Sequence, residues 1–186
     1  MKLTKLLERL DYKVVAGSDN IEITELVNDS RKVVPGSAFV CISGAVSDGH
    51  QYVKDVAERG AAAVIVEKDV EVPEGLTVIK VENTRYALAL MSAAYFGYPA
   101  EKLKTIGITG TKGKTTTTYM VKAILEEVGH KVGLIGTIEA IIGDKTIPSN
   151  NTTPESYTIQ KYFAQMVEAG CDCVVMEVSS QGLMLH

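Results

Sequence analysis

The stretch GITGTKGKTTTTYMV, residues 107–121, constrains the fold of this chain more than any other. It follows an apolar run that begins at Thr105 and leads into helical spacing, so it predicts a strand, a glycine turn and a helix start. Gly110 and Gly113 would let backbone N–H groups approach an anion, and the helix start adds free donors and partial positive charge. The pattern therefore predicts a cradle for nucleotide phosphates rather than a plain surface loop.

Lysine and threonine stand in this loop where phosphate chemistry needs them. Lys114 would bring its ammonium group to the β- and γ-phosphates as the catalytic cation, and Thr115 would give its hydroxyl to Mg²⁺. The spacing is not a strict Walker A motif, because Ile108 stands where that motif has its first glycine. ATP and Mg²⁺ are the expected cofactors, and the expected ATP contacts are Gly110, Thr111, Lys112, Gly113, Lys114, Thr115 and Thr116.

Hydrophobic periodicity divides the chain near Pro99, where a proline and two charged residues suggest a linker. The first part predicts a small mixed α/β domain over residues 1–98, and the second predicts an α/β, P-loop-type domain with a parallel sheet over residues 99–186. The expected strands are 21–28, 37–42, 62–67 and 77–81, then 105–109, 132–136 and 173–178, with a hairpin over 139–147. The expected helices are a short one marked by Leu3, Leu6, Leu7 and Leu10, then 51–59, 85–96, 114–127 and 154–168.

The second domain is expected to be incomplete at its C-terminus. Parallel sheets are normally covered on both faces and have more than three strands, so we expect this chain to be a fragment of a longer protein. Apolar residues of the helix over 114–127 have core spacing and are expected to be buried; they are Met120, Val121, Ile124, Leu125 and Val128.

Charge and hydropathy exclude two classes of partner. The net charge is −4 with no long basic run, which argues against nucleic-acid binding. No apolar run approaches the ~20 residues of a membrane helix, so no stable membrane association is expected. The N-terminal segment is interrupted by Glu8, Arg9 and Asp11 and does not resemble a secretory signal.

The chain has three cysteines, all in apolar, strand-like stretches. An odd number without a disulfide framework suits a reducing cytoplasm, which is the expected location. Cys171 and Cys173 lie on one face of a predicted strand but lack the two further ligands of a zinc site in the sequence. We therefore expect Cys171 and Cys173 to be core thiols.

Glu177 stands near the carboxyl end of the strand expected over residues 173–178. A carboxylate inside an apolar strand is costly to bury without a partner, and ligand sites of open α/β sheets lie off these strand ends. A bound cation would explain its position, so Thr115 and Glu177 are the expected Mg²⁺ ligands. A buried salt bridge is the alternative.

Several stretches together resemble one family. GITGTKGKTTT is similar to the ATP loop of the Mur ligases, which add amino acids to the peptidoglycan precursor, although that family more often has asparagine at the position of Lys112. NDSRKVVPGSAFVCISGAVSDGH, residues 28–50, resembles the uridine-nucleotide domain of the member that adds the third residue. NTTPES, residues 151–156, and MEVSSQGL, residues 176–183, also resemble that member, and the likeness covers nearly the whole chain in order.

The resemblance implies two groups of substrate contacts. The first would hold the UDP-sugar and comprises Asn28, Ser30, Ala45, Val46 and Ser47. The second would hold the muramyl peptide near its reacting carboxylate and comprises Asn151, Thr152, Thr153 and Ser179.

Local turn chemistry offers an alternative for each of these stretches. Residues 29–31, Asp-Ser-Arg, suit a turn before Pro35 and Gly36. Thr153 and Pro154 suit the cap and first position of a helix, which would also be an anion site. Asp-Gly-His at 48–50 is expected to be a structural turn rather than to supply a catalytic base.

The resemblance implies ATP-dependent amide-bond formation for peptidoglycan synthesis, hence for cell-wall growth, cell shape and division. The expected substrates are UDP-N-acetylmuramoyl-dipeptide and a diamino acid, with meso-diaminopimelate favoured over L-lysine, and the expected oligomeric state is a monomer. One alternative is another ligase of the Mur or folylpolyglutamate type. Another is a nucleotide-binding module without catalysis, because the 186 residues alone are expected to be inactive.

Overall fold

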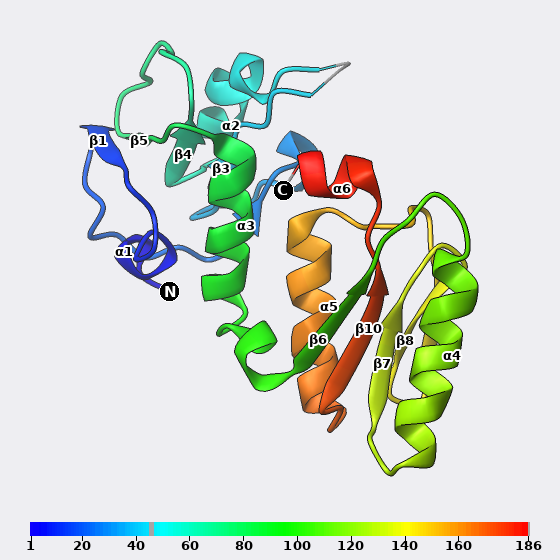
Figure 1. Ribbon diagram of the computed structural model, residues 1–186. Coiled ribbons are helices and arrows are strands. Elements are labelled where there is room, and N and C mark those ends of the chain that lie inside the picture. Colours follow the sequence, from blue (N-terminus) through cyan, green and yellow to red (C-terminus); the bar gives the residue numbers. More distant parts are fainter. Residues whose placement is uncertain (45–46, 186) are drawn as a thin grey trace. The chain divides into compact units, whose positions relative to one another are not determined.

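The computed structural model describes residues 1–44 and 47–185, which form two compact units, Met1–Tyr95 and Phe96–His186 (Figure 1). The break precedes the expected linker at Pro99, because Pro99–Lys102 forms a 3₁₀ helix within the second unit. The assignment of residues 1–98 and 99–186 to separate binding roles remains a prediction. In the described part of the chain, no helix is both long and apolar enough to cross a membrane.

The first unit is built on a five-stranded mixed sheet in the order β1-β5-β4-β3-β2. Only the β1–β5 pair is antiparallel. Apolar side chains of the central strands and of α2 form one buried cluster, which includes Phe39 and Val64 from the strands and Val53 and Val56 from the helix. The elements are α1 (Leu3–Leu6), β1 (Lys13–Ala16), β2 (Leu26–Val27), β3 (Ala38–Val40), α2 (Val53–Glu58), β4 (Ala63–Val66), β5 (Thr77–Lys80) and α3 (Thr84–Tyr95).

Two expectations for the first unit are wrong. The strand expected over 21–28 is reduced to Leu26–Val27, because the backbone before it bonds elsewhere: Ile21 O accepts from Leu3 N–H and Ile23 N–H donates to Met1 O. Strand β1, which the periodicity did not predict, forms by antiparallel pairing with the edge of β5. Both differences come from long-range backbone pairing rather than from local propensity.

The second unit has a five-stranded sheet in the order β6-β10-β7-β8-β9. Strands β6 (Lys104–Ile108), β10 (Cys173–Glu177) and β7 (Val132–Ile135) are parallel, as the alternation of strands and helices predicts. The expected hairpin, β8 (Glu139–Ile142) and β9 (Lys145–Pro148), extends this sheet by antiparallel pairing. The remaining elements are α4 (Lys114–Glu127), α5 (Ser156–Glu168) and α6 (Ser180–Met184).

Helices α4 and α5 pack on opposite faces of this sheet (Figure 1). Val174 of β10 belongs to a buried cluster with Phe163 of α5, whereas its neighbour Val175 packs with Val121 and Leu125 of α4. Alternating residues of a strand point to opposite faces, so one apolar run supplies both interfaces. This packing fixes the carboxyl ends of β6, β7 and β10 at one edge, where the candidate site lies.

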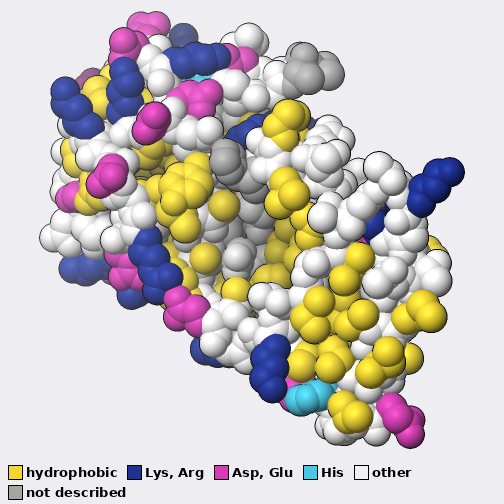
Figure 2. Space-filling view, in the orientation of Figure 1, with side chains coloured by type: hydrophobic (Ala, Val, Ile, Leu, Met, Phe, Trp, Pro, Cys, Tyr) yellow, Lys and Arg dark blue, Asp and Glu magenta, His cyan; other side chains and the backbone are white. Residues whose placement is uncertain are grey.

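The outer side of α4 is more apolar and more exposed than its spacing predicts. Met120, Ile124 and Val128 are 62%, 65% and 69% exposed, so their expected burial is wrong. They share a helical face that points away from the sheet, whereas Val121 and Leu125 contact it. Hydrophobic side chains also gather over the second unit in Figure 2.

Substitutions on the exposed face of α4 and in the buried sheet should change the stability of the fold by different amounts. Ile124→Gln is expected to change the free energy of unfolding by no more than about 0.5 kcal/mol, as at other exposed positions. Leu134→Ala in β7, where the side chain is fully buried, should cost about 2–5 kcal/mol through lost burial and a cavity. Chemical denaturation of both variants measures the difference. A large loss in Ile124→Gln would show that the exposed face is packed in solution.

Candidate active site

The glycine-lysine loop joins the carboxyl end of β6 to the start of α4, as expected. Gly113 occupies the position before the helix with φ of 79°, a left-handed conformation that favours glycine, and no side chain caps this helix end. The first N–H groups of α4 therefore have no side-chain acceptor and can serve an anion. Lys114 Nζ donates to Gly110 O at 2.9 Å, which folds the ammonium group back over the loop. The intervening Thr111 and Lys112 are exposed, and so is Thr116 in the first turn of the helix.

Glu177 ends β10 with its side chain buried beside the start of α4. The Thr115 hydroxyl donates to Glu177 Oε2 at 3.0 Å. Thr137, which follows β7, donates its backbone N–H to Oε1 at 2.8 Å and its hydroxyl to Oε2 at 3.1 Å. The structure thus brings together Thr115 and Glu177, which lie 62 positions apart in the sequence.

The hydrogen bonds that the Glu177 carboxylate accepts come from neutral donors, Thr115 and Thr137. In the residues that the structure describes, no lysine or arginine forms an ion pair with it, so the alternative of a buried salt bridge is not observed. A Cβ at Gly136 would lie 2.6 Å from Glu177 Oε1, so any larger residue there would displace the carboxylate from its present position. Carboxylate and hydroxyl oxygens are hard ligands of the kind that Mg²⁺ prefers, and this donor set fits that ion.

A cavity of about 400 Å³ is lined in part by Thr137, the residue that donates to this carboxylate. Thr152 and Thr137 are joined by a hydroxyl–hydroxyl bond of 3.1 Å at its wall. The Thr153 hydroxyl donates to Glu177 O at 3.0 Å and accepts from Ser179 N–H at 2.9 Å. All four residues expected to hold the muramyl peptide line this cavity: Asn151, Thr152, Thr153 and Ser179.

The expected helix start at Thr153 and Pro154 is wrong. Helix α5 begins at Ser156, its preceding residue is Glu155, and no side chain caps it. The Thr153 hydroxyl bonds to the backbone at the end of β10 instead, so this residue fixes the cavity wall rather than the helix end.

Sequence reasoning missed Thr137. Its only signal was its place directly after an expected parallel strand, where site residues of α/β folds gather. It also missed the bond from the Tyr119 hydroxyl to Glu139 Oε1, at 2.7 Å. Burial, this bond and the nearby carboxylates of Glu139 and Glu177 raise the pKa of Tyr119 to about 12, so the phenol stays protonated beside the site.

The first unit holds the residues expected to contact a UDP-sugar. Asn28 is exposed after β2, and Ser30 opens a 3₁₀ helix over Ser30–Lys32. The Asp29 carboxylate accepts from Arg31 N–H and from its guanidinium, which holds the pKa of Asp29 at about 2. The local turn chemistry expected here is thus confirmed and leaves Ser30 half-exposed.

The second stretch of that group is only partly described. Ala45 and Val46 lie outside the described residues, and Ser47 is exposed with its Oγ 3.2 Å from the Tyr52 hydroxyl. His50 Nε2 accepts from Glu67 N–H at 3.1 Å, so Nδ1 carries the proton and donates to Asp48 Oδ1 at 2.6 Å. Both ring nitrogens are engaged within the fold, in agreement with the structural turn expected at residues 48–50.

Two family models match the chain. The Mur ligase middle domain matches residues 108–186, and the model described as "Mur ligase family, catalytic domain" matches residues 22–96. The two matches together contain residues 110–116 of the glycine-lysine loop, the Glu177 strand end and the loop around Ser30.

Curated relatives match the chain from end to end. Proteins named UDP-N-acetylmuramoyl-L-alanyl-D-glutamate–2,6-diaminopimelate ligase are 49% identical in Clostridium perfringens and 48% identical in Clostridioides difficile. Each alignment covers 100% of this chain but 38% of the relative, so the chain spans well under half the length of these proteins.

Solved structures show the same fold. A structure titled UDP-N-acetylmuramoyl-L-alanyl-D-glutamate–2,6-diaminopimelate ligase matches with a TM-score of 0.80 at 21% identity, over 100% of this chain and 37% of that one. MurF from Thermotoga maritima in complex with ADP matches with a TM-score of 0.55 at 23% identity, over 84% of this chain and 32% of that one.

Proposed function

This chain belongs to the Mur ligase family, and we propose from that premise that its protein is an ATP-dependent amide-bond ligase of peptidoglycan synthesis. The proposed reaction adds a diamino acid, meso-diaminopimelate, to UDP-N-acetylmuramoyl-L-alanyl-D-glutamate. The names of relatives at 48–49% identity support this choice of substrates. We place the reaction in the cytoplasm and treat the protein as a monomer.

The bond between Thr115 and Glu177 carries the proposal. It joins the glycine-lysine loop to a carboxylate that also accepts from Thr137, and Thr137 lines a polar cavity together with Thr152, Thr153 and Ser179. The γ-phosphate of a nucleoside triphosphate bound to the loop would therefore lie close to the carboxylate of a substrate in the cavity. A ligase that activates a carboxyl group with ATP needs this adjacency.

The proposed chemistry begins when the D-glutamyl carboxylate attacks the γ-phosphate of ATP and releases ADP. The amine of the diamino acid then attacks the resulting acyl phosphate and displaces inorganic phosphate. Lys114 would neutralise charge on the transferring phosphoryl group, and the α4 N–H groups would hold its oxygens. Thr115 and Glu177 would hold Mg²⁺, which neutralises phosphate charge when bound.

One binding experiment separates the candidate functions. Titration of the isotopically labelled chain with UDP-N-acetylmuramoyl-L-alanyl-D-glutamate should shift amide resonances at 28–31, at 44–47 and around the cavity residues 151–153. Uridine diphosphate alone should shift the first two groups, because it lacks the peptide. Tetrahydrofolate diglutamate should shift neither, whereas shifts from the folate compound alone would favour a folylpolyglutamate-type ligase. If no uridine compound shifted residues 28–31, the assignment of the first unit would be wrong.

A further inference from the structure

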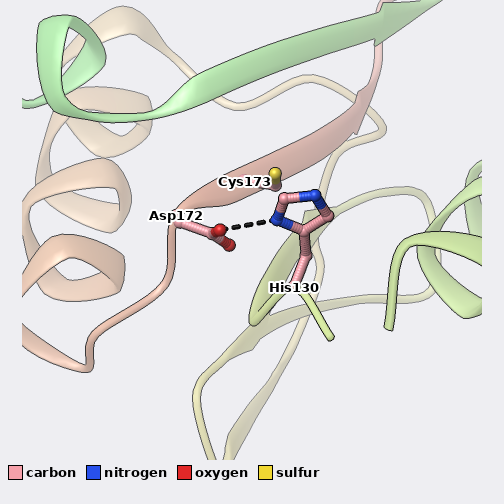
Figure 3. Close-up of side chains that lie close together, drawn as sticks. All are labelled: His130, Asp172 and Cys173. Atoms are coloured by element: carbon pink, nitrogen blue, oxygen red, sulfur yellow. Dashed lines mark hydrogen bonds and ion pairs between the residues drawn. The ribbon is translucent and has the colours of Figure 1, made fainter. Parts of the chain in front are cut away.

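A histidine, an aspartate and a cysteine meet at the amino ends of β7 and β10, the sheet edge opposite the phosphate loop (Figure 3). His130 lies in the turn between α4 and β7, whereas Asp172 and Cys173 stand at the start of β10. The ligand atoms of these residues, a ring nitrogen, a carboxylate oxygen and a thiol sulfur, all lie within 4.8 Å of one another. No step of the proposed ligase reaction uses these side chains.

Backbone hydrogen bonds hold this cluster in place. Lys131 N–H donates to Asp172 Oδ1 at 3.0 Å, which directs Oδ2 toward His130 Nδ1, 2.6 Å away. His130 N–H donates to Leu125 O at the end of α4, and Asp172 N–H donates to Lys131 O. Hydrogen bonds of this kind, behind the ligand atoms, orient the ligands of metal sites.

We propose that His130, Asp172 and Cys173 bind a zinc ion, with water in the fourth position. Imidazole, thiolate and carboxylate are the three ligand types that Zn²⁺ takes in proteins. Around tetrahedral zinc with bonds of about 2.0–2.3 Å, ligand atoms lie roughly 3.3–3.8 Å apart. Side-chain rotation must therefore open the 2.6 Å contact between His130 Nδ1 and Asp172 Oδ2, and it must shorten any separation near the 4.8 Å limit by up to about 1 Å. The partly exposed side chains of His130 and Asp172 have room for that rotation, and the thiol proton passes to solvent.

The bound ion would link the turn between α4 and β7 to the turn between α5 and β10. His130 follows α4 and Asp172 follows α5, and these helices pack on opposite faces of the sheet. The site differs from the Glu177 site in its ligands, because the oxygen set there suits Mg²⁺ whereas a sulfur and a nitrogen suit Zn²⁺. Cys171 and Cys173 are both buried free thiols, as expected from the sequence. In this proposal Cys173 also binds zinc, and its partner ligands come from tertiary contacts rather than from the spacing of the cysteines.

Cobalt spectroscopy of the 186-residue chain tests this proposal. With Co²⁺ alone as the probe, the wild type should show a sulfur-to-cobalt charge-transfer band together with intense visible bands of four-coordinate cobalt, and Zn²⁺ should displace both. Cys173→Ser should abolish the charge-transfer band, and Cys171→Ser should keep it, because Cys171 is a second buried thiol that lies outside the cluster.

Zinc affinity supplies the second measurement. His130→Ala should raise the Kd for Zn²⁺ by more than the ~10- to 100-fold that losing an outer hydrogen-bond partner costs. The His130 side chain is at the surface, so this variant should fold, and zinc should raise the Tm of the wild type but not of His130→Ala. Equal zinc affinity in wild type and His130→Ala, or a cobalt spectrum without the thiolate band, would overturn the proposal. Loss of ligase substrate binding would leave it standing, because the two sites share no residue.

Discussion

Lys114→Ala is expected to weaken Mg·ATP binding by about 10- to 150-fold, which corresponds to roughly 1.5–3 kcal/mol for a lost charge-assisted contact. The lysine stands at the start of α4, with its ammonium group 2.9 Å from Gly110 O, so it lies over the loop where phosphates would bind. The α4 N–H groups remain in the variant, so weak binding should persist. Isothermal titration calorimetry of the 186-residue chain gives both affinities.

Lys112→Ala is the matched control for this charge change. Lys112 is an exposed lysine of the same loop, and it is expected to contribute mainly through its backbone, so its removal should cost less. Equal losses in the two variants would mean that the loop acts only through net charge. Unchanged affinity in Lys114→Ala would contradict the assigned role of that side chain.

Glu177→Gln is expected to have opposite effects on stability and on Mg²⁺ binding. The ligand-free variant should unfold at the same or a higher temperature, because a buried charge without a cationic partner is removed and an acceptor oxygen remains for Thr137 N–H. Replacing the carboxylate beside a bound Mg²⁺ by a neutral amide should weaken binding of the ion by about 3–5 kcal/mol. The gain in ATP affinity that Mg²⁺ provides should therefore fall at least ~100-fold.

Calorimetric titrations with ATP in the presence and absence of Mg²⁺, together with thermal unfolding, measure these effects. In the absence of Mg²⁺, wild type and Glu177→Gln should bind ATP alike, whereas Lys114→Ala should be weaker under both conditions. This contrast separates a lost metal ligand from a damaged phosphate loop. If Mg²⁺ strengthened ATP binding equally in wild type and Glu177→Gln, the ion would not be held by that carboxylate.

Much of the second unit could be predicted because its signals are local. Glycines, a lysine and a threonine at fixed spacing placed the loop between β6 and α4, and alternation of strands and helices predicted the parallel pairing of β6, β7 and β10. The bounds of helix α4 were predicted correctly, but the prediction of which residues it buries was partly wrong. Burial depends on what packs against a helix, and the same spacing fits Met120, which is exposed, and Leu125, which contacts the sheet.

The first unit was less predictable because its strands depend on partners far away in the sequence. Strand β1 is formed by its hydrogen bonds to β5. The segment before Leu26 hydrogen-bonds to the first residues of the chain instead of joining the sheet. Hydrophobic alternation cannot reveal such pairing, since the residues that satisfy the backbone are not neighbours in the sequence.

The sequence by itself determined the residue types and their order: a glycine-lysine loop, a carboxylate at a strand end and hydroxyl-rich segments, whose chemistry depends on the side chains themselves. Tertiary structure decided which of these groups meet. Parallel pairing of β10 with β6 and β7 brings Glu177 to Thr115 and to Thr137, which sequence reasoning missed. The same pairing places His130 beside Cys173 at the other edge. Because parallel strands align their like ends, a sheet gathers distant residues at its two edges, and spacing along the chain does not reveal those meetings.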